Sequence, residues 1–208
     1  MVFRRIRRAE GNTAGVDRRE YDRRRGDLHH RPPRLLITDP IRSSYAIRRA
    51  EPRDIAGIHA CLDDAFAPYQ GQYPPLAFRD TVPPADILIE RLETMMVFVA
   101  TDASGRTIGT ISASVLADNE GHLRGMAVAP RWQGSGVAAG LLDRALDALR
   151  AAGCSRVTLD TTAFLERAIL FYRANGFEPT GRTKDFFGIP LYEFSKSLPG
   201  APDRMDGM

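Results

Sequence analysis

The sequence of 208 residues contains little cysteine, lysine or tryptophan and has no long hydrophobic run. The two cysteines, Cys61 and Cys154, lack a CxxC partner and metal-ligand spacing, which excludes a disulfide framework and predicts two buried thiols and no metal site. No apolar stretch approaches the roughly 20 residues that cross a bilayer, and no apolar segment follows the basic N-terminus as in a secretory signal. These absences indicate a globular cytoplasmic protein with no membrane partner.

Positive charge is concentrated at the N-terminus. Residues 1–34 hold eleven Arg and five acidic residues, a net charge of +6, whereas the whole chain carries +3, so the remainder is acidic. We predict a disordered Arg-rich tail over 1–42, a folded domain over 43–198 and a flexible tail over 199–208. An acidic domain is not expected to bind nucleic acid, although the tail leaves a tail-directed nucleic-acid-binding module as an alternative.

Hydrophobic periodicity divides the domain into alternating strands and helices. The expected strands are 45–48, 95–100, 107–115, 121–129, 156–161, 177–183 and 191–198. The expected helices are one that begins at Pro52 and others over 85–93, 136–151 and 165–175. Residues 67–84, rich in Pro, Gly and Tyr, are expected to form a loop with a helical turn near 76–80. The helix over 136–151 should bury one face, made by Val137, Leu141, Leu142, Ala145, Leu146 and Leu149.

The most informative motif lies between the central strand and this long helix. The strand stops at Pro130, and Gly134 and Gly136 precede the helix. The first N–H groups of a helix have no internal partner and lie at the positive end of the helix dipole. Glycines remove the Cβ atoms that would keep a phosphate away from those groups. The motif therefore predicts a site for a phosphate-bearing ligand.

Two known kinds of phosphate site fit this motif poorly. A Walker loop is excluded, because no Gly-Lys-Ser/Thr follows the glycines. A dinucleotide fold, and with it a nicotinamide-dependent reductase, is an alternative, because residues 134–139 fit G-x-G-x-x-A and Asp160 ends a strand where a ribose-binding acid would lie. However, four residues separate the strand from the glycines, and too little chain follows Asp160 for repeated βα units.

A third kind of site fits more of the chain. Gln133-Gly134-Ser135-Gly136-Val137-Ala138 resembles the Q/R-x-x-G-x-G/A pyrophosphate loop of the GNAT superfamily of acetyl-CoA-dependent N-acetyltransferases. Residues 168–177 resemble that family's A-x-x-F-Y-x-x-x-G-F signature. The resemblance covers about 45–198 and implies an α/β (α+β) fold with a mixed, mostly antiparallel central sheet of about seven strands flanked by helices. One departure is Leu165, where the family often has an Asn that holds the pantetheine arm.

The resemblance implies how acetyl-CoA, the expected cosubstrate, would bind. Arg131 and the loop up to Ala138 would hold the pyrophosphate, and a strand bulged at Gly125 would pair with the pantetheine amides. The N–H of Val128 would face the thioester oxygen. The implied cofactor-binding residues are Met126, Ala127, Val128, Arg131, Gln133, Gly134, Ser135, Gly136, Val137 and Ala138.

The resemblance also implies direct attack of a primary amine on the thioester in a ternary complex. Tyr172 matches the family's helix tyrosine that returns a proton to the leaving thiolate. Glu120 and His122 are candidates for the base, with Asp160 and Asp118 as further possibilities, and a free amine reactive enough to need no base is the remaining alternative. A non-catalytic acyl-CoA-binding protein is the alternative to an enzyme.

The amine acceptor is not identified by the sequence. Aromatic and polar residues available to bind it are Tyr69, Gln70, Tyr73, Phe78, Phe186 and Phe187. No acidic cluster argues for a polycationic acceptor. A homodimer is expected from the family, although the sequence leaves the oligomeric state, the acyl-chain preference and the role of the tail open.

Overall fold

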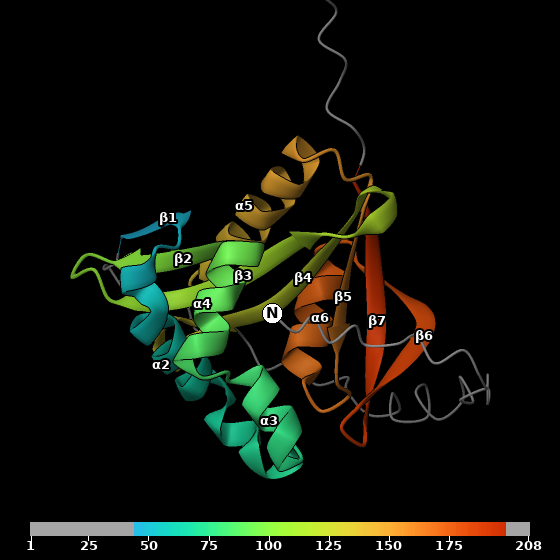
Figure 1. The fold of residues 1–208 in the computed structure, drawn as a ribbon, viewed down its shortest axis with the longest axis horizontal. Coiled ribbons are helices and arrows are strands. Elements are labelled where there is room, and N and C mark those ends of the chain that lie inside the picture. The colour runs from blue at the N-terminus through green and yellow to red at the C-terminus, as the bar shows by residue number, and fades with distance from the viewer. Residues whose placement is uncertain (1–43, 199–208) are drawn as a thin grey trace, which may run out of the picture. The chain divides into compact units, whose positions relative to one another are not determined.

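The computed structural model describes residues 44–198, so the predicted tails over 1–42 and 199–208 lie outside the described residues (Figure 1). The strands are β1 (Tyr45–Arg49), β2 (Met96–Asp102), β3 (Thr107–Val115), β4 (Glu120–Val128), β5 (Arg156–Thr161), β6 (Glu178–Phe186) and β7 (Ile189–Ser197). The α-helices are α2 (Ile55–Phe66), α3 (Pro75–Thr81), α4 (Ala85–Thr94), α5 (Val137–Ala151) and α6 (Glu166–Ala174). Short 3-10 turns are η2 (Pro52–Asp54), η3 (Ala67–Gln72), η4 (Ala117–Asn119) and η5 (Pro130–Trp132).

The seven strands of the described part form one sheet in the order β1-β2-β3-β4-β5-β7-β6. Every neighbouring pair in it is antiparallel except β4 and β5, which are parallel. This topology confirms the predicted mixed, mostly antiparallel sheet of seven strands flanked by helices. It differs from the parallel doubly wound sheet that the dinucleotide-binding alternative requires.

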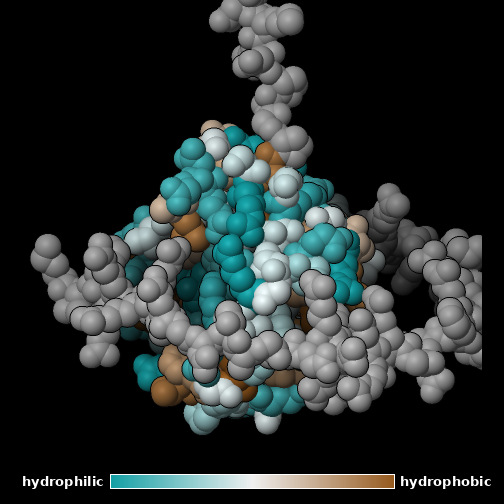
Figure 2. Space-filling model, turned by 90° about the vertical axis from the view of Figure 1, so that its right-hand side faces the viewer, coloured by the Kyte–Doolittle hydropathy of each residue, from teal (hydrophilic) through white to brown (hydrophobic). Residues whose placement is uncertain are grey.

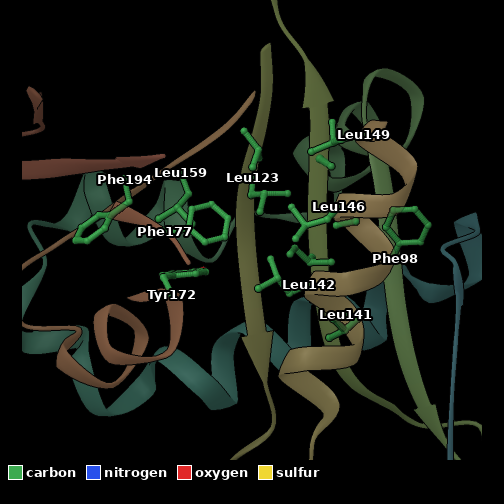
Figure 3. Packing of buried hydrophobic residues seen from close by; sticks show 14 of the residues in the cluster. Phe98, Leu123, Leu141, Leu142, Leu146, Leu149, Leu159, Tyr172, Phe177 and Phe194 are labelled. Atoms are coloured by element: carbon green, nitrogen blue, oxygen red, sulfur yellow. The ribbon is translucent and has the colours of Figure 1, made fainter. Parts of the chain in front are cut away.

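Helices cover both faces of the sheet and enclose two hydrophobic cores. On one face, α5 and α6 pack against a cluster that includes Phe98, Leu123 and Leu159. Figure 3 shows the leucines of α5 beside these strands and Tyr172 of α6 further along the same layer. On the other face, α2 and α4 pack on side chains that alternate with the first set, such as Val97 and Val99 of β2. The predicted thiols, Cys61 and Cys154, are buried and unpaired, one in each core.

The predicted apolar face of α5 is confirmed at all six positions, each of them at most 2% exposed. Glycine in the sheet makes room for this helix. A Cβ on Gly109 of β3 would lie 2.8 Å from Leu141 Cδ1 and 2.9 Å from Val137 Cγ1. The helix axis is therefore held close to the sheet, which fixes the position of its N-terminus.

The segment over 67–84 contains more helix than the predicted loop with one turn. It forms η3 and α3, and α4 follows almost immediately. Pro75 stands at the first position of α3, where its fixed φ suits a helix and its missing N–H leaves no bond unmade. The prolines that suggested a loop therefore mark helix starts.

A bulge interrupts β4 at the predicted position. Thr110 of β3 lies opposite Ala127, whereas Ser112 lies opposite Arg124, so β4 contains one extra residue here. Gly125 has φ +60°, a left-handed conformation that glycine adopts without strain. The bulge confirms the predicted role of Gly125 and turns the second half of β4 away from β5.

Candidate active site

The central strand has an unpaired edge. The β4–β5 ladder runs from Glu120 opposite Arg156 to Leu123 opposite Leu159, and beyond it the two strands diverge (Figure 1). The N–H of Ala129 donates to Ile108 O of β3 at 2.9 Å, so strand alternation directs the N–H and C=O of Val128 to the opposite edge. We call the edge of β4 from Arg124 to Val128 that faces away from β3 the open edge. It offers backbone groups to which an extended amide chain can pair.

Gln133 lies at this edge. Its Nε2 donates to Val128 O at 3.2 Å. The side chain therefore joins the glycine loop to the end of β4. The Gln133 N–H donates to Pro130 O at 3.3 Å, so both its backbone N–H and its side-chain amide are used within the protein.

The glycine loop turns directly into α5. Gly134 and Gly136 have φ +83° and +94°, and Gly136 is the N-cap residue of the helix. The helical ladder begins with the Gly140 N–H, which donates to Gly136 O at 3.0 Å, so the N–H groups of residues 137–139 precede it. Val137 is fully buried and anchors the first turn of α5 in the core. Ser135 is fixed by its Oγ, which donates to Trp132 O at 2.6 Å.

The Arg131 side chain extends toward Asp102 and not toward the glycine loop. Its side chain is 61% exposed, and its guanidinium lies 3.6 Å from the carboxylate of Asp102 at the end of β2. An exposed pair of this kind adds little stability. The side chain is therefore free to rearrange if a phosphate binds nearby.

Tyr172 of α6 reaches across to the open edge. Its hydroxyl donates to Met126 Sδ at 3.4 Å, and its ring packs against Phe171 and Phe177 at centroid distances of 5.5 and 5.7 Å. Burial raises the pKa of the phenol, which therefore keeps its proton at neutral pH. The structure thus places a protonated hydroxyl beside the second half of β4.

Polar side chains gather at the paired half of β4 and β5. The Thr158 hydroxyl donates to Glu120 Oε1 at 3.2 Å and lies 3.1 Å from His122 Nδ1. That hydroxyl has one proton, which it can give to Glu120 or to Gly121 O at 3.3 Å. With the proton given to either oxygen, we assign Nδ1 of His122 as the donor to Thr158 and Nε2 as the unprotonated nitrogen. Nε2 lies 3.9 Å from Asp160 Oδ2. We call Glu120, His122, Thr158 and Asp160 the polar cluster.

Cations hold the carboxylates of this region. Arg156 binds Glu120 at 2.9 Å, and Lys184 binds Asp160 at 2.9 Å. The nearby Glu193 of β7 is 5% exposed and lies within 4 Å of Arg156, Arg182 and Lys184. Of the three candidate carboxylate bases, Glu120 and Asp160 are therefore engaged in ion pairs, and Asp118 lies exposed in η4.

His122, unlike these carboxylates, is uncharged at neutral pH. Burial lowers its pKa, and this effect outweighs the opposing attraction of Asp160. The imidazole is therefore neutral at pH 7 and able to accept a proton.

Protonation of His122 should also be visible in stability. Because the folded-state pKa is lower than that of the unfolded chain, the unfolded chain binds more protons once the pH falls below about 6.5. We expect the free energy of unfolding to fall more steeply between pH 7.5 and 5 in the wild type than in His122→Gln, measured by urea denaturation. His59→Gln, which removes an imidazole on α2, is the matched control and should follow the wild type. Equal decline in all three proteins would contradict the assignment.

The predicted acceptor aromatics divide into two groups. Tyr69, Tyr73 and Phe78 join Phe164 of the β5–α6 loop, with Tyr73 and Phe164 in edge contact at 4.8 Å and Tyr69 stacked on Phe164 at 6.3 Å. Phe186 and Phe187 pack on each other at the turn between β6 and β7. In the view of Figure 2, the uncovered surface is hydrophilic over its centre, whereas hydrophobic surface gathers at its lower end. The aromatic cluster ties the segment over 67–84 to the start of α6.

Several residues of this region were not singled out from the sequence, among them Thr158, Phe164 and Arg91. Thr158 reads as an ordinary strand residue, and Phe164 as part of a loop. Arg91 of α4 is 6% exposed, although arginine is rarely buried. Its position three residues after Leu88, on the apolar face of the helix, was the available signal.

Comparisons with known proteins agree with this geometry. Residues 58–177 match the model of the Acetyltransferase (GNAT) family. A curated relative, an aminoglycoside N(6')-acetyltransferase type 1 from Stenotrophomonas maltophilia, is 33% identical in an alignment of 162 residues that covers 73% of this chain and 97% of the relative. The chain therefore belongs to the GNAT family.

Solved structures show the same fold. The PaiA N-acetyltransferase of Thermoplasma acidophilum in complex with coenzyme A has a TM-score of 0.63 at 19% identity, over 74% of this chain and 99% of that one. The ribosomal-protein-S18-alanine N-acetyltransferase of Escherichia coli has a TM-score of 0.62 at 18% identity, over 78% and 99%. As a GNAT protein with a curated N-acetyltransferase relative, the chain is an acyltransferase that uses an acyl-CoA cosubstrate and an amine acceptor.

Two further findings concern residues 44–198. No helix in this range is both long enough and apolar enough to span a bilayer. The same range contains no group of three or more His, Cys, Asp or Glu side chains placed to hold a metal ion.

Proposed function

We propose that the protein transfers an acetyl group from acetyl-CoA to a primary amine by direct attack in a ternary complex. The observation that carries this proposal is the convergence of three features at one place: the open edge of β4, the N-terminus of α5 and the Tyr172 hydroxyl. Cytoplasmic location and a homodimer remain predictions from the sequence.

The proposed binding of acetyl-CoA follows the backbone. The pyrophosphate accepts hydrogen bonds from the N–H groups of Gly134, Gly136 and Ala138, where the helix dipole favours negative charge. The pantetheine amides pair with the open edge at Met126 and Val128. The thioester oxygen then lies at the Val128 N–H, which stabilises the negative charge that develops during attack. Support comes from the direction of that N–H.

The proposed reaction uses two proton-transfer residues. The amine nitrogen forms a bond to the thioester carbon while Nε2 of His122 accepts an amine proton, directly or through water. The carbon–sulfur bond breaks, and the thiolate of CoA takes the proton of the Tyr172 hydroxyl. Of the predicted bases, His122 is favoured because it is neutral, whereas Glu120 is held by Arg156 and Thr158.

The experiment is an amine-dependent release of CoA. Purified protein is incubated with acetyl-CoA and a panel of primary amines, which includes an aminoglycoside because a relative bears that name. Free thiol is measured, and the melting temperature is recorded with and without acetyl-CoA. We expect thiol release above the amine-free rate for at least one amine, and stabilisation by about 2.7 kcal/mol at a hundredfold excess over Kd.

Two results would count against the proposal. Stabilisation by acetyl-CoA without amine-dependent thiol release would favour the alternative of a non-catalytic acyl-CoA-binding protein. No stabilisation by acetyl-CoA at all would overturn the proposed site.

A further inference from the structure

A buried arginine lies beneath the bulge of β4. Arg91 of α4 is 6% exposed, and its Nη2 donates to the backbone oxygen of Asp80 at 3.0 Å. Its Nη1 lies 3.4 Å from the position that a Cβ on Gly125 would occupy. The guanidinium therefore reaches the point where β4 leaves β5, next to the proposed reaction site.

The positive charge of Arg91 is poorly compensated. Burial and the neighbouring Arg124 lower its pKa to about 10, which leaves it charged at pH 7. No carboxylate of residues 44–198 forms an ion pair with it within 4.0 Å, and the carboxylate of Asp80 is bound by Arg124 at 2.9 Å. A buried charge is costly unless an opposite charge or several hydrogen bonds satisfy it. Within the described part of the chain, Arg91 has one hydrogen-bond acceptor for its five N–H groups.

Arg124 extends this positive region toward the polar cluster. It follows His122 by two residues on β4, so both side chains project from the same face of the sheet. Its charge acts on both neighbours, lowering the pKa of Arg91 and of His122. On the other side of His122, each carboxylate has a cation of its own. The uncompensated charge beside the reaction site is therefore positive.

The phosphates of acetyl-CoA are not suited to neutralise it. In the proposed binding mode the pyrophosphate lies at the N-terminus of α5, and α5 packs on the opposite face of the sheet from α4. The face that carries Arg91 and Arg124 is also the face of His122, from which the amine is to be deprotonated. The ligand that approaches the two arginines is the acceptor.

We propose that Arg91 and Arg124 bind an oxyanion of the acceptor, so that the substrate class is an amine carrying a carboxylate or a phosphate group. This inference rests on the proposed N-acetyltransferase function. A guanidinium presents paired N–H groups that match both kinds of oxyanion. A polycationic amine such as an aminoglycoside would meet like charge at this position.

The test compares amines that differ only in the anion. β-Alanine is paired with β-alaninamide, O-phosphoethanolamine with ethanolamine, and an aminoglycoside is included. Thiol release gives kcat and KM for each amine with wild type, Arg124→Gln, Arg91→Lys and Arg79→Gln. Arg79 is an exposed residue of α3, so Arg79→Gln is the control that removes one positive charge outside the site. Melting temperatures in saturating CoA record folding and direct binding of each amine.

We expect an anionic amine to have a KM at least about tenfold lower than its neutral partner in the wild type. This preference should disappear in Arg124→Gln, weaken in Arg91→Lys and persist in Arg79→Gln. If the ratio of KM values is larger for the β-alanine pair, the site prefers a carboxylate, and if it is larger for the O-phosphoethanolamine pair, the site prefers a phosphate. If no amine is turned over, a larger rise in melting temperature with anionic than with neutral amines, lost in Arg124→Gln, supports the same conclusion.

Several results would overturn the inference. The first is that both members of each pair have equal KM values and give equal melting temperatures. The second is that the enzyme prefers the aminoglycoside. The third is that Arg124→Gln raises KM equally for charged and neutral amines. The last would mark the arginines as structural. All three leave the proposed function intact, whereas absence of acetyl-CoA binding would defeat that function itself.

Discussion

Replacing Gly136 with alanine is expected to weaken acetyl-CoA binding about a hundredfold, measured by isothermal titration calorimetry. Gly136 has φ +94° at the N-cap of α5, where a Cβ adds strain on the order of 1–2 kcal/mol. In the folded protein the added methyl meets only the Tyr45 hydroxyl at 3.6 Å, an ordinary contact. The loss of affinity therefore comes from the methyl group standing where the pyrophosphate approaches and from altered directions of the first helical N–H groups.

Gly153 provides the matched control at the other end of the same helix. It has φ +83°, and a Cβ there would meet nothing within 4 Å. Gly153→Ala should therefore lose similar stability while keeping its affinity for acetyl-CoA. Equal affinities in the two variants would show that the glycine loop is a structural turn and not a phosphate site.

Removing the hydroxyl of Tyr172 is expected to lower kcat about 10- to 100-fold and to leave the KM for acetyl-CoA unchanged. The hydroxyl is buried, and its hydrogen bond goes to Met126 Sδ, a weak acceptor. Tyr172→Phe should therefore fold with no loss of stability. Steady-state kinetics and thermal unfolding of the same preparation separate these two effects.

Tyr192→Phe on β7 is the matched control for this substitution and should keep the wild-type kcat. The proton-donor role predicts that Tyr172→Phe loses most when the leaving thiolate receives no proton from solvent, at the high end of the pH range. If Tyr172→Phe has the wild-type kcat at every pH, Tyr172 is a core residue and does not donate the proton.

Much of the fold could be predicted because its elements carry strong local patterns. The apolar face of α5 repeats every three to four residues and has no break, so all six buried positions could be identified. The strands β3 and β5 have the predicted bounds because turn residues flank them. The region over 67–84 was harder, since proline both ends structure and begins helices, and the local sequence does not distinguish the two uses.

The site could be predicted in part. The bulge at Gly125 and the left-handed glycines before α5 follow from local chemistry. Thr158 joins His122 and Glu120 only because β5 pairs with β4 in one register, and Arg91 reaches the bulge only because α4 packs on that face of the sheet. Such contacts depend on tertiary packing, which periodicity does not encode. That Leu165, in place of the family's Asn, removes one contact to the pantetheine arm stays a prediction.

The most direct test of the central claim is hydrogen–deuterium exchange of the wild-type protein with and without acetyl-CoA. The claim is that the open edge of β4 and the N-terminus of α5 together hold the cosubstrate. We predict slower exchange in peptides that cover residues 126–138, with Val128 and the first turn of α5 most protected. Binding of acetyl-CoA that protects other segments and leaves 126–138 unchanged would contradict the account.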